Sequence, residues 1–219
     1  EGDKTLGEIT TSHYDSKDNE IFILGQVNAD TDEYDRSVII HEFAHYFENQ
    51  FSRSDSIGGE HSSGDILDIR VAWGEGFANA FYSMVTDDVL YIDTAGLSQA
   101  LSFGFDLENN VCANPGWYSE CSVQSIMYDL YDTNSDGADN VSLGLSSIYN
   151  TLIGSQKITP AFTSIFSFIK NFKDNNGASV NLINTLVGAQ NIDVISSVYG
   201  DGQATNNPGA TDQLPLYAQ

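Results

Sequence analysis

The chain has 219 residues, of which 41% are hydrophobic, and this is enough to bury the core of one sizeable domain. Its 31 acidic and 8 basic residues give a net charge of −23. A surface this acidic repels phosphate backbones, which excludes nucleic acid as a partner. No apolar run approaches the roughly 18–20 residues that a membrane span needs, so no membrane partner is expected either. The chain opens abruptly at Glu1, and we expect it to be part of a longer, multidomain precursor.

The first elements expected along the chain are a β-hairpin and a helix. Residues 8–25 contain two β-rich segments separated by the polar turn SKDN, which predicts the hairpin. Asp30 is expected to cap a helix that runs to about Phe51, with Glu33 as its capping-box partner. The Gly/Ser-rich segment 52–64 predicts a loop.

Helices dominate the rest of the predicted structure. We expect them at about 65–85 and 122–131, and near 143–153, 160–173 and 179–188, while the stretch between the first two is mixed. Strands followed by helices indicate an α+β fold. The predicted organisation is one domain, 1–219, with a strand-containing N-terminal lobe to about residue 60, a mainly helical lobe over about 65–200 and a coil tail over 201–219.

The segment HEFAH carries the strongest functional signal. His41 and His45 are four residues apart on the predicted helix and therefore lie on one face, one turn apart. Two imidazoles at this spacing can bind one tetrahedral Zn²⁺. Glu42, beside the first histidine, is placed to act as the general base toward a water molecule activated by the zinc ion.

A catalytic zinc site needs a third protein ligand. The metzincin continuation HExxHxxGxxH is excluded, because its last two positions are Glu48 and Phe51 here. Two glutamates remain as candidates. Glu75 lies in the apolar helical segment AWGEGFANAF, where a carboxylate is costly to bury unless it is paired or binds a metal, whereas Glu60 lies in a polar loop. We therefore favour Glu75, with an ordinary ion pair to Arg70 or Arg53 as its alternative role.

The two cysteines predict a disulfide. Cys112 and Cys121 flank the turn-forming Pro115–Gly116 pair, which can bring them together. A disulfide implies an oxidising compartment and hence a secreted protein. Two unrelated buried thiols are the alternative.

HEFAH together with WGEGFANAF resembles the gluzincin superfamily of zinc metallopeptidases, which includes thermolysin-like peptidases, bacterial collagenases and aminopeptidases. The similarity covers roughly residues 8–130, and the spacing between His45 and Glu75 is nearer to the collagenase pattern. The resemblance implies a zincin-like fold, in which a small N-terminal sheet accompanies the active-site helix. It also implies that a strand such as TTSHYD pairs with an extended substrate.

Further site residues follow from that resemblance. Asn79 stands four residues after Glu75. There it is expected to hold the imidazole of a zinc ligand through a hydrogen bond, with helix packing as the alternative. No histidine follows His61, so the oxyanion donor is expected to be a tyrosine. Tyr118 is the first choice and Tyr128 the second, while His61 and Arg53 are further candidates for contacting substrate.

The segment 132–137 resembles the first half of a calcium-binding loop. Asp132, Asn134 and Asp136 supply oxygen ligands at the spacing DxNxDG, and Gly137 permits the sharp turn. The pattern then breaks, because Leu143 replaces the glutamate expected at the twelfth position. A calcium ion and a polar helix end without an ion therefore both remain open.

These residues together predict a secreted zinc-dependent endopeptidase that hydrolyses protein or peptide substrates. A zinc aminopeptidase is one alternative, although Asp32, Glu33 and Asp35 are assigned to the helix start rather than to binding a substrate amine. The other alternative is a non-catalytic binding or adhesion module on a zincin fold. The presence of Glu42 argues against that module, because a structural zinc site needs no base.

Overall fold

A computed structural model describes residues 3–109, 111–134 and 139–203. It contains both helices and sheets, which confirms the α+β class. The helices are α1 (Arg36–Phe51), α2 (Ile69–Thr86), α3 (Glu120–Asp129), α4 (Gly144–Thr151), α5 (Ile165–Asn175) and α6 (Val180–Ala189). The strands are β1 (His13–Asp15), β2 (Glu20–Phe22), β3 (Gly25–Gln26), β4 (Asp30–Thr31), β5 (Leu90–Ala95) and β6 (Leu101–Asp106).

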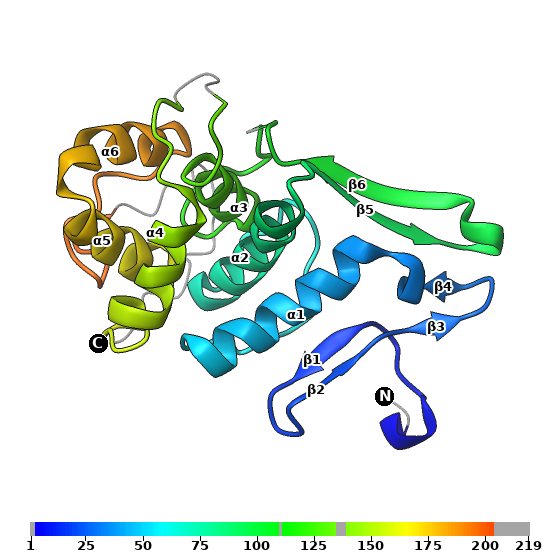
Figure 1. Ribbon diagram of the computed structural model, residues 1–219. Helices are drawn as coiled ribbons and strands as arrows, with labels where there is room; N and C mark the ends of the chain where they lie inside the picture. The colour runs from blue at the N-terminus through cyan, green and yellow to red at the C-terminus, as the bar shows by residue number, and fades with distance from the viewer. Residues whose placement is uncertain (1–2, 110, 135–138, 204–219) are drawn as a thin grey trace, which may run out of the picture.

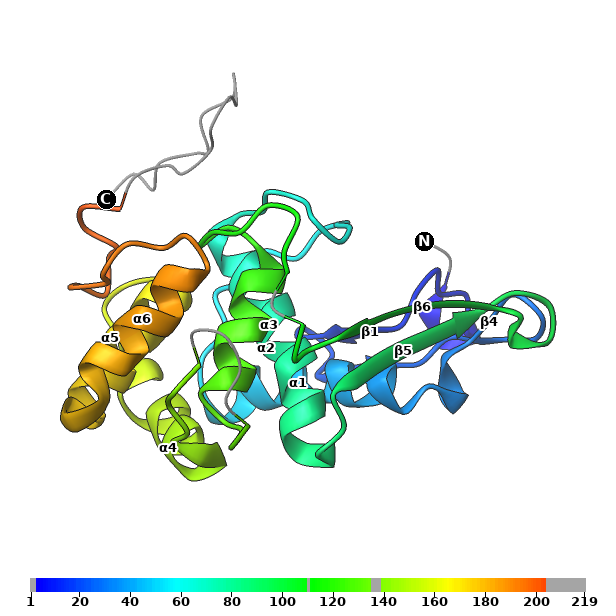
Figure 2. The ribbon, with the colours of Figure 1, turned by 90° about the horizontal axis from the view of Figure 1, so that it is seen from above.

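The strands form two antiparallel sheets. The predicted N-terminal hairpin is present but shorter than expected, with β1 pairing to β2 from His13 opposite Phe22 to Asp15 opposite Glu20. The second sheet has the order β3-β4-β5-β6 and is extended mainly by the β5–β6 hairpin. Figures 1 and 2 show this hairpin running beside α1 and away from α4, α5 and α6. The sequence analysis missed it, and its strands follow α2 instead of preceding the helices.

The start of the first long helix differs from the prediction. Asp30 lies in β4, residues 32–34 form a short 3-10 helix, and α1 begins only at Arg36. The carboxylate of Asp35, at the N-cap position, accepts hydrogen bonds from the backbone and hydroxyl of Thr94 in β5 instead of capping α1. This long-range contact draws the segment before α1 into the sheet, so the predicted capping box does not form.

The helix α2 is the centre of the fold. It lies between α1 and α3 (Figures 1 and 2), and nearly all its residues from Ile69 to Met84 are buried. Asp68 caps it by accepting from the backbone N–H of Arg70. Trp73 and Phe77 are fully buried, and Trp73 stacks against Phe168 of α5, so α2 also joins the helices of the C-terminal part to the core.

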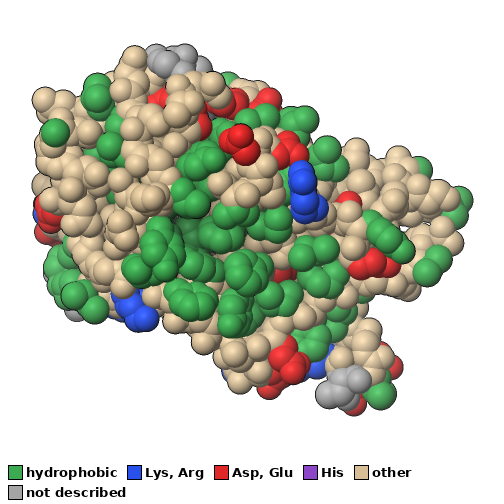
Figure 3. Space-filling model, viewed as in Figure 1, with side chains coloured by type: hydrophobic (Ala, Val, Ile, Leu, Met, Phe, Trp, Pro, Cys, Tyr) green, Lys and Arg blue, Asp and Glu red, His purple; other side chains and the backbone are tan. Residues whose placement is uncertain are grey.

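The surface seen from the side of α1 is partly apolar. Figure 3 shows a band of hydrophobic side chains across this face. Ile39, Phe43 and Phe51 of α1 are apolar side chains with exposures of 38–46%. Among the helices of the described ranges, none is both long and apolar enough to cross a membrane. The predicted disulfide between Cys112 and Cys121 is formed, with their Cα atoms 5.7 Å apart.

Candidate metal centre

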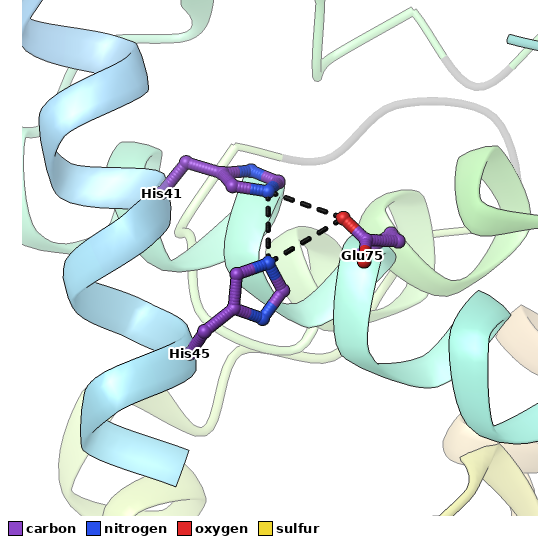
Figure 4. A group of neighbouring side chains, drawn as sticks. All are labelled: His41, His45 and Glu75. Carbon is purple, nitrogen blue, oxygen red and sulfur yellow. Dashed lines mark hydrogen bonds and ion pairs between the residues drawn. The ribbon is translucent and has the colours of Figure 1, made fainter. Parts of the chain in front are cut away.

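The facing sides of α1 and α2 bring His41, His45 and Glu75 together, as Figure 4 shows. The Nε2 atoms of the two histidines are 3.0 Å apart. The Oε2 atom of Glu75 lies 3.2 Å from Nε2 of His41 and 3.4 Å from Nε2 of His45. One donor atom from each residue therefore occupies a corner of a small triangle.

The size of this triangle can be compared with the geometry of a zinc site. Ligands at about 2.0–2.1 Å in tetrahedral positions are separated by roughly 3.3–3.4 Å. The observed edges of 3.0–3.4 Å match that separation closely. Two imidazole nitrogens and one carboxylate oxygen are also a donor set that zinc accepts, with a fourth position left for another ligand. The residues present therefore fit a zinc ion.

The charges of the group favour a cation at its centre. Burial by itself raises the pKa of Glu75, but the charge of His45 and hydrogen bonds from both histidines hold that pKa well below its usual range. For His45, burial lowers the pKa, but the carboxylates around it, Glu75 first and then Glu42 and Glu48, together raise the pKa to about 9. The buried carboxylate thus stabilises positive charge between the helices, as either a proton or a metal ion would supply.

Side chains that contact His41 from α2 and β5 fix the orientation of its ring. Oδ1 of Asn79 lies 2.9 Å from Nδ1 of His41, and the amide of Asn79 donates to Oε1 of Gln124 in α3. When Nδ1–H of the neutral ring donates to Asn79, Nε2 is left without a proton and is free to bind a metal ion. The ring of Tyr91 in β5 packs edge-on against the same imidazole, with 6.1 Å between ring centroids. The structure thus places Asn79 where a residue supporting a metal ligand is needed, and it adds Gln124 and Tyr91, which sequence reasoning missed.

Glu42 follows His41 on α1 and is 7% exposed. Its charge contributes to the raised pKa values of His45 and of Tyr91, so its carboxylate lies close to the histidine group. Glu60, the alternative third ligand, is exposed in the loop before α2 and belongs to neither of the two groups of described residues that could hold a metal ion.

The loop between α1 and α2 brings a third histidine to the group. Nε2 of His61 lies 3.5 Å from Oε2 of Glu75 and 3.4 Å from Oε2 of Glu120 at the start of α3. Sequence reasoning offered His61 only as a substrate contact and missed Glu120. The signal for Glu120 was its place in the first turn of a helix, next to a cysteine of the disulfide. A carboxylate at the start of a helix is explained equally well by its favourable interaction with the helix dipole.

The two candidate tyrosines are buried in the core. Tyr118 is 2% exposed, and its hydroxyl donates to the carbonyl of Pro115 at 3.5 Å. Tyr128 is 3% exposed, and burial together with the carboxylates of Glu108 and Asp132 raises its pKa. The proposed catalytic role of either tyrosine stays a prediction.

The candidate calcium loop is only partly described. Asp132 accepts a hydrogen bond from the backbone N–H of Asn134, whose amide donates to Glu108. Asp136 lies outside the described residues. Calcium at this loop therefore stays a prediction.

Fold and site together define an α+β protein with a candidate metal centre between two packed helices. Comparison with protein families gives a match over residues 5–167 to the family described as Mycolysin C-terminal domain. The chain belongs to this family, which is a peptidase family. Comparison with curated proteins and with solved structures gives no match.

The family match corrects the resemblance drawn from the sequence. The assignment to gluzincin peptidases of the thermolysin-like and collagenase types is wrong, because the family that matches most of the chain is a different one. HExxH followed by a glutamate in an apolar helix predicts a metal site, and short motifs of this kind do not define a family. A domain named for the C-terminal part of a peptidase also fits a longer precursor, and it fits the non-catalytic alternative better than the catalytic interpretation.

Proposed function

We propose that this chain binds one zinc ion through His41, His45 and Glu75 and hydrolyses peptide bonds as a zinc-dependent endopeptidase. The observation that carries the proposal is the triangle of donor atoms, whose edges of 3.0–3.4 Å suit a tetrahedral ion. The α+β arrangement supports a zincin-like fold, in which strands flank the helix that carries the HExxH motif. The disulfide supports secretion into an oxidising compartment.

Each residue then has a distinct task. When bound, zinc supplies a Lewis acid that polarises the scissile carbonyl and lowers the pKa of a water molecule. Glu42 accepts the proton of that water and passes it to the leaving amine, which is the work of a general base and then of a general acid. Asn79 keeps His41 in the tautomer whose Nε2 lone pair faces the ion, because its oxygen accepts from Nδ1.

The donor to the developing oxyanion is Tyr118 or His61. Tyr118 is the residue proposed from the sequence, and its hydroxyl must leave the carbonyl of Pro115 to serve. His61 is supported by its position, since its Nε2 atom already lies beside the carboxylate of Glu75. Changing Tyr118 to Phe and His61 to Gln separately, with zinc content and kcat/KM measured for each, distinguishes them.

A non-catalytic zinc-binding module is the second candidate, and the same histidine favours it. A structural zinc site has four protein ligands and no open position. A small movement of the loop would bring His61, 3.5 Å from Glu75, to the fourth position. The family match to a peptidase's C-terminal domain supports this candidate as well.

Four variants, one of them a control, separate the two candidates. Purified protein is stripped of metal, reloaded with zinc and assayed for bound zinc and for cleavage of casein and of an internally quenched peptide. For the endopeptidase we expect one zinc per chain, and Glu42→Gln keeps the zinc while kcat falls by roughly 10²–10⁴-fold. Glu75→Ala loses the zinc, whereas Glu60→Ala, the matched control, retains it. His61→Ala keeps the zinc if the site is open and loses it if His61 is the fourth ligand.

The results of the zinc-binding and cleavage assays distinguish the candidate functions. A protein that holds zinc tightly, releases it on His61→Ala and cleaves no substrate is the non-catalytic module. Unchanged cleavage by Glu42→Gln would contradict the mechanism, and zinc loss with Glu60→Ala alone would contradict the choice of Glu75. Cleavage of aminoacyl amides but not of blocked peptides identifies an aminopeptidase.

A further inference from the structure

Three carboxylates converge near the start of α1, outside the candidate zinc centre. Asp30 lies in β4, Asp32 begins the 3-10 helix at 32–34, and Asp93 lies in β5. One carboxylate oxygen of each residue lies within 4.8 Å of those of the other two. The group joins segments far apart in the sequence, and it exists because β4 pairs with β5 through Asp30 and Ala95.

The most buried member of the group has one oxygen without a partner. Asp32 is 4% exposed, and its Oδ2 atom accepts from the hydroxyl of Ser12, which the backbone N–H of Leu24 holds in place. Its Oδ1 atom is buried without a hydrogen-bond partner, and so is Oδ1 of Asp30. A buried carboxylate oxygen without a donor is strongly unfavourable unless a cation or a proton compensates it.

No basic side chain in the described part of the chain is seen to supply that compensation. Within the described parts of the chain, the lysine, arginine and histidine ion pairs all involve other carboxylates, such as Arg36 with Asp88. Burial raises the pKa of Asp32 to about 7 against the opposing Ser12 hydrogen bond, and the carboxylates of Asp30 and Asp93 add to the rise. The neighbouring Asp35 differs, because both of its oxygens accept from Thr94.

We propose that Asp30, Asp32 and Asp93 bind a calcium ion. The group offers only carboxylate oxygens, which hard divalent cations prefer. Calcium ligands lie at about 2.3–2.6 Å, so two of them on opposite sides of the ion are separated by up to roughly 5 Å, which covers the observed spread. Magnesium, at about 2.0–2.1 Å with octahedral geometry, requires a tighter group of ligands. Asp30 and Asp93 are only partly buried, which leaves room for water to complete the coordination.

This site connects the sheet to the helix that carries the histidines. The ion ties β5 to the segment just before α1, where the chain has only short elements. Asp93 is two residues from Tyr91 and so lies on the same face of β5, and Tyr91 packs against His41. Calcium thereby holds in place the strand that supports His41. The inference stands without the proposed zinc function, because none of its three ligands belongs to the zinc centre.

The test measures thermal unfolding of the full chain against calcium concentration. Protein is stripped with a chelator, dialysed, reloaded with one equivalent of zinc and titrated with calcium or magnesium at pH 8. Calcium at about 100 times its dissociation constant is expected to raise Tm by roughly 5–10 °C. Asp93→Asn and Asp32→Asn are each expected to abolish this rise. Their calcium-free Tm should equal or exceed that of the wild type, because removing one of three carboxylates relieves repulsion and shows that the variants fold.

Asp132→Asn is the matched control, because it removes a carboxylate from the segment 132–137, the calcium loop predicted from the sequence. It is expected to keep the calcium-dependent rise. A wild-type Tm that does not respond to 10 mM calcium would overturn the proposal and leave a shared proton as the compensating charge. A response lost in Asp132→Asn and kept in Asp93→Asn would overturn it in favour of the 132–136 loop. An equal response to magnesium would overturn the assignment to calcium.

Discussion

The contact between α2 and α3 depends on Gly76, and replacing it with alanine tests the packing around the metal centre. A Cβ atom at this position would lie 2.5 Å from Cβ of Val123 and 2.6 Å from the carbonyl oxygen of Glu120. Normal contacts between carbon atoms are about 3.5–4.0 Å, so relief requires α3 to move by roughly 1 Å. Val123 is fully buried and the Glu120 carbonyl is backbone, so a side-chain rotation cannot remove the clash.

Gly74, on the other side of Glu75, is the matched control. A Cβ atom there would lie 3.7 Å from Cβ of Ser56, an ordinary contact. Gly74→Ala should stabilise the protein by about 0.5–1 kcal/mol, because alanine is the better helix former. In Gly76→Ala the same gain is outweighed by overpacking, and we expect a net loss of about 1–3 kcal/mol. The two variants should therefore differ by roughly 1.5–4 kcal/mol, or about 3–16 °C in Tm.

The assay is urea unfolding followed by far-ultraviolet circular dichroism, run with zinc and with chelator. Zinc affinity is measured on the same samples. We expect Gly76→Ala to weaken zinc binding, because moving α3 displaces Gln124, which holds Asn79. Equal stability of the two variants would refute the α2–α3 packing and with it the supporting hydrogen bonds of the metal centre.

Three further predictions concern residues around this centre. Asn79→Ala should weaken zinc binding by about 10–100-fold and Asn79→Asp should restore it, as measured by competition with a chromophoric chelator, because His41 needs an acceptor at Nδ1. Burial raises the pKa of Glu48 to about 7 against the opposing hydrogen bond from Trp73. The folded protein therefore holds the proton of Glu48 more tightly than the unfolded chain does, and the stability that this contributes is fully present below about pH 4.5 and is lost as pH rises through 7. Glu48→Gln should therefore gain up to about 3 kcal/mol over the wild type at pH 8 and little at pH 4.5, in urea unfolding of the metal-free protein; an equal gain at both pH values would contradict the raised pKa. Replacing both Cys112 and Cys121 with serine should cost about 2–3 kcal/mol of unfolding free energy, because the disulfide closes a loop with sequence separation 9.

The parts of the site that depend on local spacing were predictable from the sequence. The four-residue spacing of His41 and His45 determines their common face on α1, and a carboxylate in an apolar helical segment singled out Glu75. Asn79 was predicted from its place one turn after Glu75 and from the resemblance to gluzincin peptidases, which the family match has since overturned. The family was not predictable in this way, because a ligand pattern describes the chemistry of a site and not its ancestry.

The parts that depend on long-range pairing were not predictable. The β5–β6 hairpin does show alternating apolar residues at Leu101, Phe103 and Phe105, but short alternation of this kind is a weak signal beside six helical patterns. Two contacts join segments that are distant in the chain. Asp35 contacts Thr94, so that α1 begins later than predicted, and His61 lies next to Glu120. Local propensity carries no information about such contacts.

The choice between an enzyme and a binding module depends on the fourth position around the metal. The donors His41, His45 and Glu75 suit zinc in either case, and the buried amide pair of Asn79 and Gln124 would orient His41 equally well in either case. Glu42 distinguishes the two, because a structural site gains nothing from a second carboxylate that is 7% exposed beside its ligands and pays the cost of burying it. His61 argues in the opposite direction, because a histidine already next to Glu75 can close the site. Zinc retention by His61→Ala combined with loss of turnover by Glu42→Gln is therefore the pair of results that identifies a peptidase.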